Sequence, residues 1–229
     1  DKMLDILLYW AAKGVDGFRC DMVELVPPEF MKWLIAEVKS KYPSMIFIAE
    51  VYKKELYGEY VRSVGFDYLY DKSGLYDTLR TVVEKNTEDN GMPVELWQSA
   101  TGITRNWQFL GDLQPYMLNF LENHDEQRFA SDYFGGDAHK TFAPLYVSLF
   151  LNTAPFMIYF GEEVGEKGMD EEGFSGKDGR TTIFDWWSVG SVRRLRKLIQ
   201  SGEYKTLTVS RLVKAGLKKE EAEIFCHFA

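Results

Sequence analysis

Three acidic residues each stand directly behind a short apolar run. Asp21 closes the run GFRCD, Glu50 closes IFIAE, and Asp125 closes FLENHD. An ionised acid at the end of a buried strand is expensive to remove from water, so three of them indicate that one edge of a sheet gathers carboxylates. Grouped carboxylates perform acid/base and nucleophilic chemistry on glycosidic bonds.

The residues around these acids predict a division of roles. A retaining glycosidase needs an ionised carboxylate nucleophile and a protonated carboxylic acid about 5–5.5 Å apart. Arg19 lies two residues before Asp21, on the same side of the strand, where a cation lowers the pKa of the Asp21 carboxyl. Glu50 follows four apolar residues, so desolvation among negative neighbours is expected to raise its pKa. Asp125 is then available to stabilise an oxocarbenium-like transition state, and His124 to donate a hydrogen bond to a sugar hydroxyl.

Each acid also has a purely structural explanation. Asp21 with Arg19 is compatible with an ion pair at a strand end. Glu50 is compatible with a cap on the following segment. The run Asn123-His124-Asp125 is typical of an Asx-type turn. These explanations remain open for each residue alone, but three acids on successive strands of one sheet favour a common site.

Strand-like and helix-like segments alternate along most of the chain, which predicts a parallel sheet covered by helices. Residues 87–112 are polar and indicate a helix or loops around Leu96-Trp97, and the glycine-rich, charged residues 161–182 indicate a long loop. The expected strands are 15–21, 45–49, 65–71, 116–121 and 154–160, and the expected helices are 2–12, 28–42, 54–63, 73–86, 138–153, 188–200 and 218–229.

The order of elements favours a barrel over a nucleotide-binding sheet. No glycine-rich phosphate-binding motif comes after any expected strand. In a (β/α)8 barrel the catalytic side chains come from the C-terminal ends of different strands, and a complete barrel needs eight of them. The expected fold class is therefore α/β, a partial (β/α)8 TIM barrel. Five acids occupy strand-end positions: Asp21, Glu50, Asp71, Asp125 and Glu162.

Composition excludes several classes of protein. The 229 residues carry a net charge of −8, so nucleic acid is an unfavourable partner, and the basic run at 193–197 is interpreted as the wet face of a helix. Cys20 and Cys226 are too few for a disulfide scaffold, and Cys20 is expected to be a buried free thiol. No apolar run reaches the length of a membrane span. The first residues read as helix interior and not as a signal peptide, so the sequence indicates no compartment.

Through these motifs the sequence resembles glycoside hydrolase family 13, the α-amylase family. Residues 17–21 resemble its second conserved region, residues 47–50 its third and residues 120–125 its fourth. Residues 156–163 look like its eighth strand, and Gly179-Arg180 with residues 184–186 resemble the segment after it. The resemblance implies that strands four to eight of the barrel are present.

The resemblance also implies a role for each motif residue. It places Asp21 at the nucleophile, Glu50 at the general acid/base and Asp125 at the transition-state stabiliser. It places Arg19 at the invariant arginine and His124 at a substrate contact. The implied activity is retaining hydrolysis of α-glucosidic bonds in starch, glycogen or maltooligosaccharides. The resemblance implies that no cofactor is required, with calcium possible in the family.

The chain also departs from the family pattern. The first conserved region, strands one to three and the all-β domain after the barrel are missing, so residues 1–229 are expected to be the C-terminal portion of the catalytic domain. Glu24-Leu25 stand where many α-amylases have Lys-His after the nucleophile, which leaves the product-side contacts open. The calcium site of the family draws on the missing part and on that histidine, so calcium is not supported by this segment.

Other functions compete with hydrolysis. The same site serves transglycosylases and isomerases, and non-catalytic relatives act as interaction subunits, although the intact acids weigh against the last. A carbohydrate-binding module is disfavoured by the parallel βα pattern. The side chains of Trp97, Trp107, Tyr133 and Trp186 are expected either to stack on sugars or to fill the core. Because five strands leave two unpaired edges, the 229-residue piece alone is expected to be inactive and to need the remainder of the barrel.

Overall fold

The computed structural model describes residues 2–84, 99–168, 178–185, 189–205 and 207–229. The chain divides into two compact units. The first unit comprises Asp1–Thr78, Gln98–Asn119 and Leu149–Phe156, and the second comprises Leu79–Trp97, Phe120–Ser148 and Met157–Ala229.

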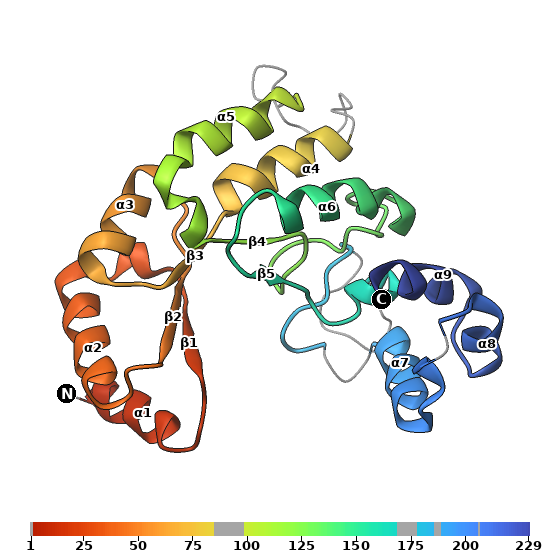
Figure 1. Ribbon diagram of the computed structural model, residues 1–229, viewed down its shortest axis with the longest axis horizontal. Helices are drawn as coiled ribbons and strands as arrows, with labels where there is room; N and C mark the ends of the chain where they lie inside the picture. The colour runs from red at the N-terminus through yellow and green to blue at the C-terminus, as the bar shows by residue number, and fades with distance from the viewer. Residues whose placement is uncertain (1, 85–98, 169–177, 186–188, 206) are drawn as a thin grey trace. The chain divides into compact units, whose positions relative to one another are not determined.

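The sheet is five-stranded with the order β1-β2-β3-β4-β5, so each strand neighbours the next one along the chain (Figure 1). The pairs β1–β2, β2–β3 and β3–β4 are parallel, and Phe18 lies opposite Phe47 in the first of them. Consecutive parallel strands with helices between them confirm the expected fold class, a partial (β/α)8 barrel. The strands are β1 (Gly17–Cys20), β2 (Ile46–Ala49), β3 (Tyr68–Tyr70), β4 (Met117–Phe120) and β5 (Phe156–Met157).

Most helices lie where the sequence pattern predicted them, with bounds that differ by a few residues, whereas helix α8 was not predicted. Helix α2 begins at Pro28, where the missing N–H of proline leaves no helical hydrogen bond unmade. The helices are α1 (Lys2–Ala11), α2 (Pro28–Lys41), α3 (Tyr57–Glu59), α4 (Asp77–Val83), α5 (Thr101–Leu110), α6 (Phe142–Phe150), α7 (Gly190–Ser201), α8 (Val209–Lys214) and α9 (Lys219–Phe228). Short 3₁₀ or π turns lie beside many of them: η1 (Val23–Leu25), η2 (Lys54–Leu56), η3 (Tyr60–Val64), η4 (Lys72–Tyr76), η7 (Gly111–Tyr116), η8 (Ala138–Thr141), η9 (Glu162–Val164) and η10 (Glu203–Lys205).

Strand β5 and helix α6 are among the elements that are shorter than the sequence pattern predicted. Strand β5 covers only Phe156–Met157 of the expected 154–160. The chain turns after it, because Glu162 accepts the N–H of Tyr159 on its carboxylate and donates its own N–H to the Tyr159 carbonyl. Helix α6 is shorter than the expected 138–153, since residues 138–141 form the 3₁₀ turn η8.

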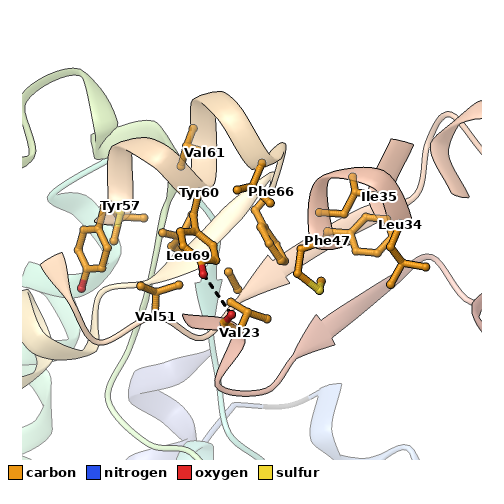
Figure 2. Packing of buried hydrophobic residues seen from close by; sticks show 14 of the residues in the cluster. Val23, Leu34, Ile35, Phe47, Val51, Tyr57, Tyr60, Val61, Phe66 and Leu69 are labelled. Carbon is orange, nitrogen blue, oxygen red and sulfur yellow. Dashed lines mark hydrogen bonds between the residues drawn. The ribbon is translucent and has the colours of Figure 1, made fainter. Parts of the chain in front are cut away.

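The core of the first unit lies between strand β2 and the helical segments that come after the strands. Phe47 and Leu69 are fully buried, and the Phe66 ring lies between Phe47, at 6.5 Å, and Tyr60, at 5.9 Å between ring centroids. The Tyr60 hydroxyl donates a 3.1 Å hydrogen bond to the Val23 carbonyl (Figure 2). This core therefore ties the loop after β1 to the segment after β2.

The second unit has its own core under helices α7, α8 and α9. Helix α9 packs on α8 and on η9. Ala222 and Leu198 are fully buried, and Phe225 packs against this core from a partly buried position. Phe228 packs against a separate small cluster of Ala130, Ala138 and Ile224. The apolar stripe expected at the end of the chain is thus confirmed.

Replacing Tyr60 by Phe is expected to lower the free energy of unfolding by about 1 kcal/mol, because one buried hydrogen bond is lost. The Val23 carbonyl keeps a second donor, the N–H of Val26 at 2.9 Å, so no acceptor is left unpaired. Urea unfolding followed by circular dichroism measures the change. Tyr9→Phe is the matched control, since Tyr9 is 56% exposed and should tolerate the change. Equal midpoints for the two variants would contradict the assignment.

Candidate active site

The first part of the site sits where the β1–β2 ladder continues beyond the strands. The N–H of Glu50 donates to the Cys20 carbonyl at 3.1 Å, and the N–H of Val23 donates to the Glu50 carbonyl at 3.2 Å. These bonds fix the backbone on both sides of Asp21 and at Glu50. Two acids from different strands are therefore brought to the same edge of the sheet, as the sequence predicted.

Arg19 contacts both acids. Its Nη1 lies 2.5 Å from Asp21 Oδ1, and its Nη2 lies 2.8 Å from Glu50 Oε1. Burial opposes the charge on Arg19, but the hydrogen bond to Asp21 and the negative charge of Glu50 outweigh burial and raise the pKa of Arg19. The guanidinium therefore stays cationic between two carboxylates.

The two acids differ sharply in exposure. The side chain of Asp21 is 74% exposed, whereas that of Glu50 is 2% exposed. An exposed carboxylate is accessible to a substrate, and a buried carboxyl group feels a lower dielectric constant. The pair thus combines one solvent-accessible carboxylate with one buried carboxyl group.

Glu50 has two further partners besides Arg19. The Tyr52 hydroxyl donates to its Oε1 at 2.9 Å, and the N–H of Met22 donates to its Oε2 at 2.9 Å. Met22 has φ 41° and is the only non-glycine residue with positive φ in the described ranges. A left-handed residue costs on the order of 1 kcal/mol, and here it aims an N–H at the acid. Glu50 therefore does not cap the following segment, the alternative that the sequence left open.

Glu24 connects the same two loops in the other direction, from the loop after β1 to the backbone after β2. It lies in η1, after β1, and its Oε2 accepts the N–H groups of Tyr52 and Lys53 at 3.0 Å each. The loop after β1 thus holds the loop after β2 through Glu24, while Glu50 holds the loop after β1 through the N–H of Met22. Sequence reasoning noticed Glu24 only as a departure from the family pattern. Tyr52 was missed, although its place two residues after Glu50 was a usable signal.

The second part of the site lies in the second unit. His124 Nε2 is 3.2 Å from Asp125 Oδ2, and the Asp125 side chain is 50% exposed. The Asn123 side chain accepts the N–H groups of Asp125 at 2.8 Å and Glu126 at 2.9 Å. This is the Asx-type turn considered from the sequence, and it presents His124 and Asp125 together.

Arg19, Asp21 and Glu50 are therefore gathered in the first unit, and His124 and Asp125 in the second. The ion pair between Arg19 and Asp21 exists alongside the contact to Glu50, so it is part of a larger cluster. That Asp125 shares one sugar ring with the other two acids stays a prediction.

The two remaining strand-end acids are buried among protein atoms. Asp71 is 2% exposed and accepts a 2.7 Å hydrogen bond from the Asn106 side chain, and burial raises its pKa. Glu162 is also 2% exposed, and burial together with the charge of Glu122 raises its pKa well above 4.5. A Cβ on Gly74 would come within 2.1 Å of Asp71 Oδ1, so glycine is required there.

Other expectations have mixed outcomes. Trp107 is 43% exposed and Tyr133 is 50% exposed, so neither fills the core, while Trp97 and Trp186 lie outside the described residues. Cys20 is a free thiol, partly buried, and burial raises its pKa to about 11.

Within the described ranges, no three His, Cys, Asp or Glu side chains are grouped to hold a metal ion. None of the helices described combines the length and hydropathy of a membrane span.

Carboxylates at the ends of consecutive parallel strands are the arrangement found in enzymes of the (β/α)8 barrel type. The family described as alpha amylase, catalytic domain, matches residues 1–198. The chain belongs to this family, which agrees with the resemblance read from its motifs.

Solved structures share the fold. The chain superposes with a TM-score of 0.60 on a cyclic alpha-maltosyl-(1→6)-maltose hydrolase from Arthrobacter globiformis, at 21% identity over 98% of this chain and 42% of that one. It superposes with a TM-score of 0.59 on an alpha-amylase from H. orenii, at 22% identity over 99% of this chain and 46% of that one.

Curated relatives match over shorter stretches. Neopullulanase 2 from Thermoactinomyces vulgaris is 27% identical over 173 residues, which are 72% of this chain and 27% of the relative. An alpha-1,4-glucan:maltose-1-phosphate maltosyltransferase from Rhodospirillum rubrum is 37% identical over 79 residues, which are 34% of this chain and 11% of the relative. The chain thus spans only a minor part of these relatives.

Glu162 should make the second unit less stable as the pH rises. Its pKa in the folded chain lies well above 4.5, so the folded state binds this proton more tightly than the unfolded state, and stability is lost as the pH rises through the raised value. Glu162→Gln keeps a neutral side chain that still accepts the N–H of Tyr159. Melting temperatures of wild type and variant, measured from about pH 5 to about pH 9, should diverge with wild type falling faster.

Glu203→Gln is the control, because Glu203 is an exposed glutamate of the same unit. Its melting temperature should match that of wild type at every pH. Parallel pH dependence for wild type and Glu162→Gln would show that the Glu162 carboxyl is not held neutral by its surroundings.

Proposed function

We propose that this chain carries the catalytic acids of a retaining α-glucan hydrolase. The observation that carries the proposal is the Arg19 guanidinium held between Asp21 and Glu50, at 2.5 and 2.8 Å from their oxygens. A single guanidinium between two carboxylates is compatible with the separation of about 5–5.5 Å in retaining enzymes, and less so with the wider spacing of inverting ones.

The proposed reaction has two steps. Glu50 donates its proton to the leaving glycosidic oxygen while Asp21 attacks the anomeric carbon and forms a glycosyl-enzyme. Glu50, now ionised, then takes a proton from a water molecule that attacks the same carbon and releases Asp21. The exposure of Asp21 and the burial of Glu50 support this assignment of roles.

The other predicted residues have supporting roles. Arg19 orients the Asp21 carboxylate through their 2.5 Å charge-assisted hydrogen bond. Asp125 stabilises the positive charge that develops on the sugar ring in both transition states, and His124 donates a hydrogen bond to a sugar hydroxyl. The exposure of Asp125, at 50%, supports a role toward a ligand.

The substrate class is proposed from the chemistry of the relatives. The hydrolase and neopullulanase named above act, by their names, on maltose-based sugars and pullulan-type glucans. We therefore propose an α-glucan or a maltooligosaccharide. We propose that residues 1–229 form strands four to eight of the barrel and their helices. The remainder of the barrel would come from sequence outside these residues.

Glycosyl transfer is the second candidate. The relatives include a maltosyltransferase that is 37% identical over 79 residues. In transfer, a sugar hydroxyl replaces water in the second step and the same three acids act. Product analysis separates the two, because hydrolysis of a glucan yields new reducing ends and transfer to another sugar does not.

Asp21→Asn and Glu50→Gln, each in the full-length protein, should lower kcat on a maltooligosaccharide by at least about 1000-fold, because each removes an essential carboxylate. Reducing-sugar release measures the loss. Asp112→Asn is the matched control, since Asp112 is 81% exposed and pairs with Arg62 away from these acids. Near wild-type activity of Asp21→Asn would remove the nucleophile assignment.

The stereochemistry of the first product tests the mechanism independently of mutation. Two displacements at the anomeric carbon retain its configuration, so the sugar released first should be the α-anomer. Proton NMR of a fresh digest, recorded before mutarotation, distinguishes the anomers. Release of the β-anomer first would indicate a single displacement and would contradict the glycosyl-enzyme.

A further inference from the structure

Glu122 and Arg128 flank the loop of residues 123–127 that presents His124 and Asp125. Both are buried, Arg128 at 0% and Glu122 at 2% exposure. Arg128 Nη1 donates to Glu122 Oε2 at 2.6 Å, and the N–H of Phe129 donates to Glu122 Oε1 at 2.7 Å. One carboxylate thus joins the start of the loop to its end.

Arg128 also binds two segments that lie after strand β5 in the chain. Its Nη2 donates to the Phe160 carbonyl at 2.7 Å, and its Nε donates to Thr181 Oγ1 at 3.0 Å. The guanidinium lies 4.5 Å from the Tyr159 ring centroid and 5.1 Å from that of Phe160. All three of its nitrogens are therefore engaged, in directions that a planar fork satisfies and a single ammonium does not.

Hydrogen bonds within the loop and contacts from helix α4 also hold the loop. Within the loop, the Asn123 side chain accepts the N–H groups of Asp125 and Glu126. From helix α4, Arg80 Nη1 contacts Glu126 Oε2 at 3.1 Å and Gln127 Oε1 at 2.7 Å. The backbone that carries Asp125 has little freedom between these contacts and the buried pair at its base.

We propose that Arg128 is a positioning residue that acts through Asp125: with Glu122 it closes the base of the loop and sets where the Asp125 carboxylate stands. The inference rests on the proposed function, in which Asp125 stabilises the transition state. A small displacement of such a group lowers the rate with little effect on substrate binding in the ground state.

A third buried acid beside the pair is consistent with this role. Burial, and next the charge of Glu122, raises the pKa of Glu162, while Arg128 opposes the shift and Glu163 adds to it. Burial also raises the pKa of Glu122, and the charge of Arg128 opposes that shift. Arg128 is thus the cation that favours the ionised form of both buried acids.

The experiment compares Arg128→Lys with Arg194→Lys in the full-length protein. Arg194 is the matched control, because it forms a two-oxygen ion pair with Glu221 in the same unit, at 2.5–3.1 Å, without contact to the loop. Arg128→Lys should lower kcat on a maltooligosaccharide by about 100-fold and change KM by less than about threefold. Arg194→Lys should lower the melting temperature and leave kcat unchanged.

A double-mutant cycle with Asp125→Asn separates positioning from mere stability. If Arg128 acts through Asp125, Arg128→Lys should have little further effect on kcat once Asp125 is replaced, so the two losses do not multiply. Multiplying losses would overturn the proposal. So would an Arg128→Lys variant with the kcat of Arg194→Lys.

A milder variant keeps the test decisive if Arg128→Lys does not fold. Thr181→Val removes only the acceptor of Arg128 Nε and should lower kcat about fivefold with KM unchanged. An unchanged kcat in this variant would likewise count against the proposal. Failure of the proposed function has a different signature, since Asp125→Asn alone would then retain activity.

Discussion

A carboxylate can be buried only if charge and hydrogen bonds replace the water that it loses, and Glu50 is the point at which this constraint organises the molecule. Its oxygens contact the Arg19 guanidinium, the Tyr52 hydroxyl and the N–H of Met22. Arg19 and Met22 come from strand β1 and the loop after it, so they reach Glu50 through the pairing of β1 with β2, whereas Tyr52 lies two residues after Glu50. The register of β1 against β2 is therefore necessary for Glu50 to be buried with these contacts.

The partners of Glu50 also hold the surrounding loops. Glu50 binds the loop after β1, and Glu24 of that loop binds the backbone after β2, so the two loops are hydrogen-bonded to each other in both directions. Rigid mutual support of this kind keeps catalytic groups at a set distance before a substrate arrives. The exposed Asp21 lies in the chain next to this hydrogen-bonded backbone. The left-handed conformation of Met22, which follows Asp21, is the strained conformation that the arrangement requires.

Local periodicity was enough to predict the main elements of the fold and one contact of the site. Alternation of strands and helices predicted the parallel sheet, and the two-residue period placed Arg19 beside Asp21. Periodicity did not predict the ties between loops, because Glu24 and Arg128 find their partners only through tertiary packing. Strand β5 ends early for the same reason, since the Tyr159 N–H goes to a side chain and not to the sheet.

The Glu122–Arg128 pair spans a fixed number of residues, and its length matters as much as its charge. An inserted or deleted residue between them would move the guanidinium off the carboxylate and leave two charges buried alone, a far larger penalty than most exchanges of side chains within the loop. During divergence, the length of this loop should therefore stay constant. Its side chains should vary freely only at positions other than Asn123 and Asp125.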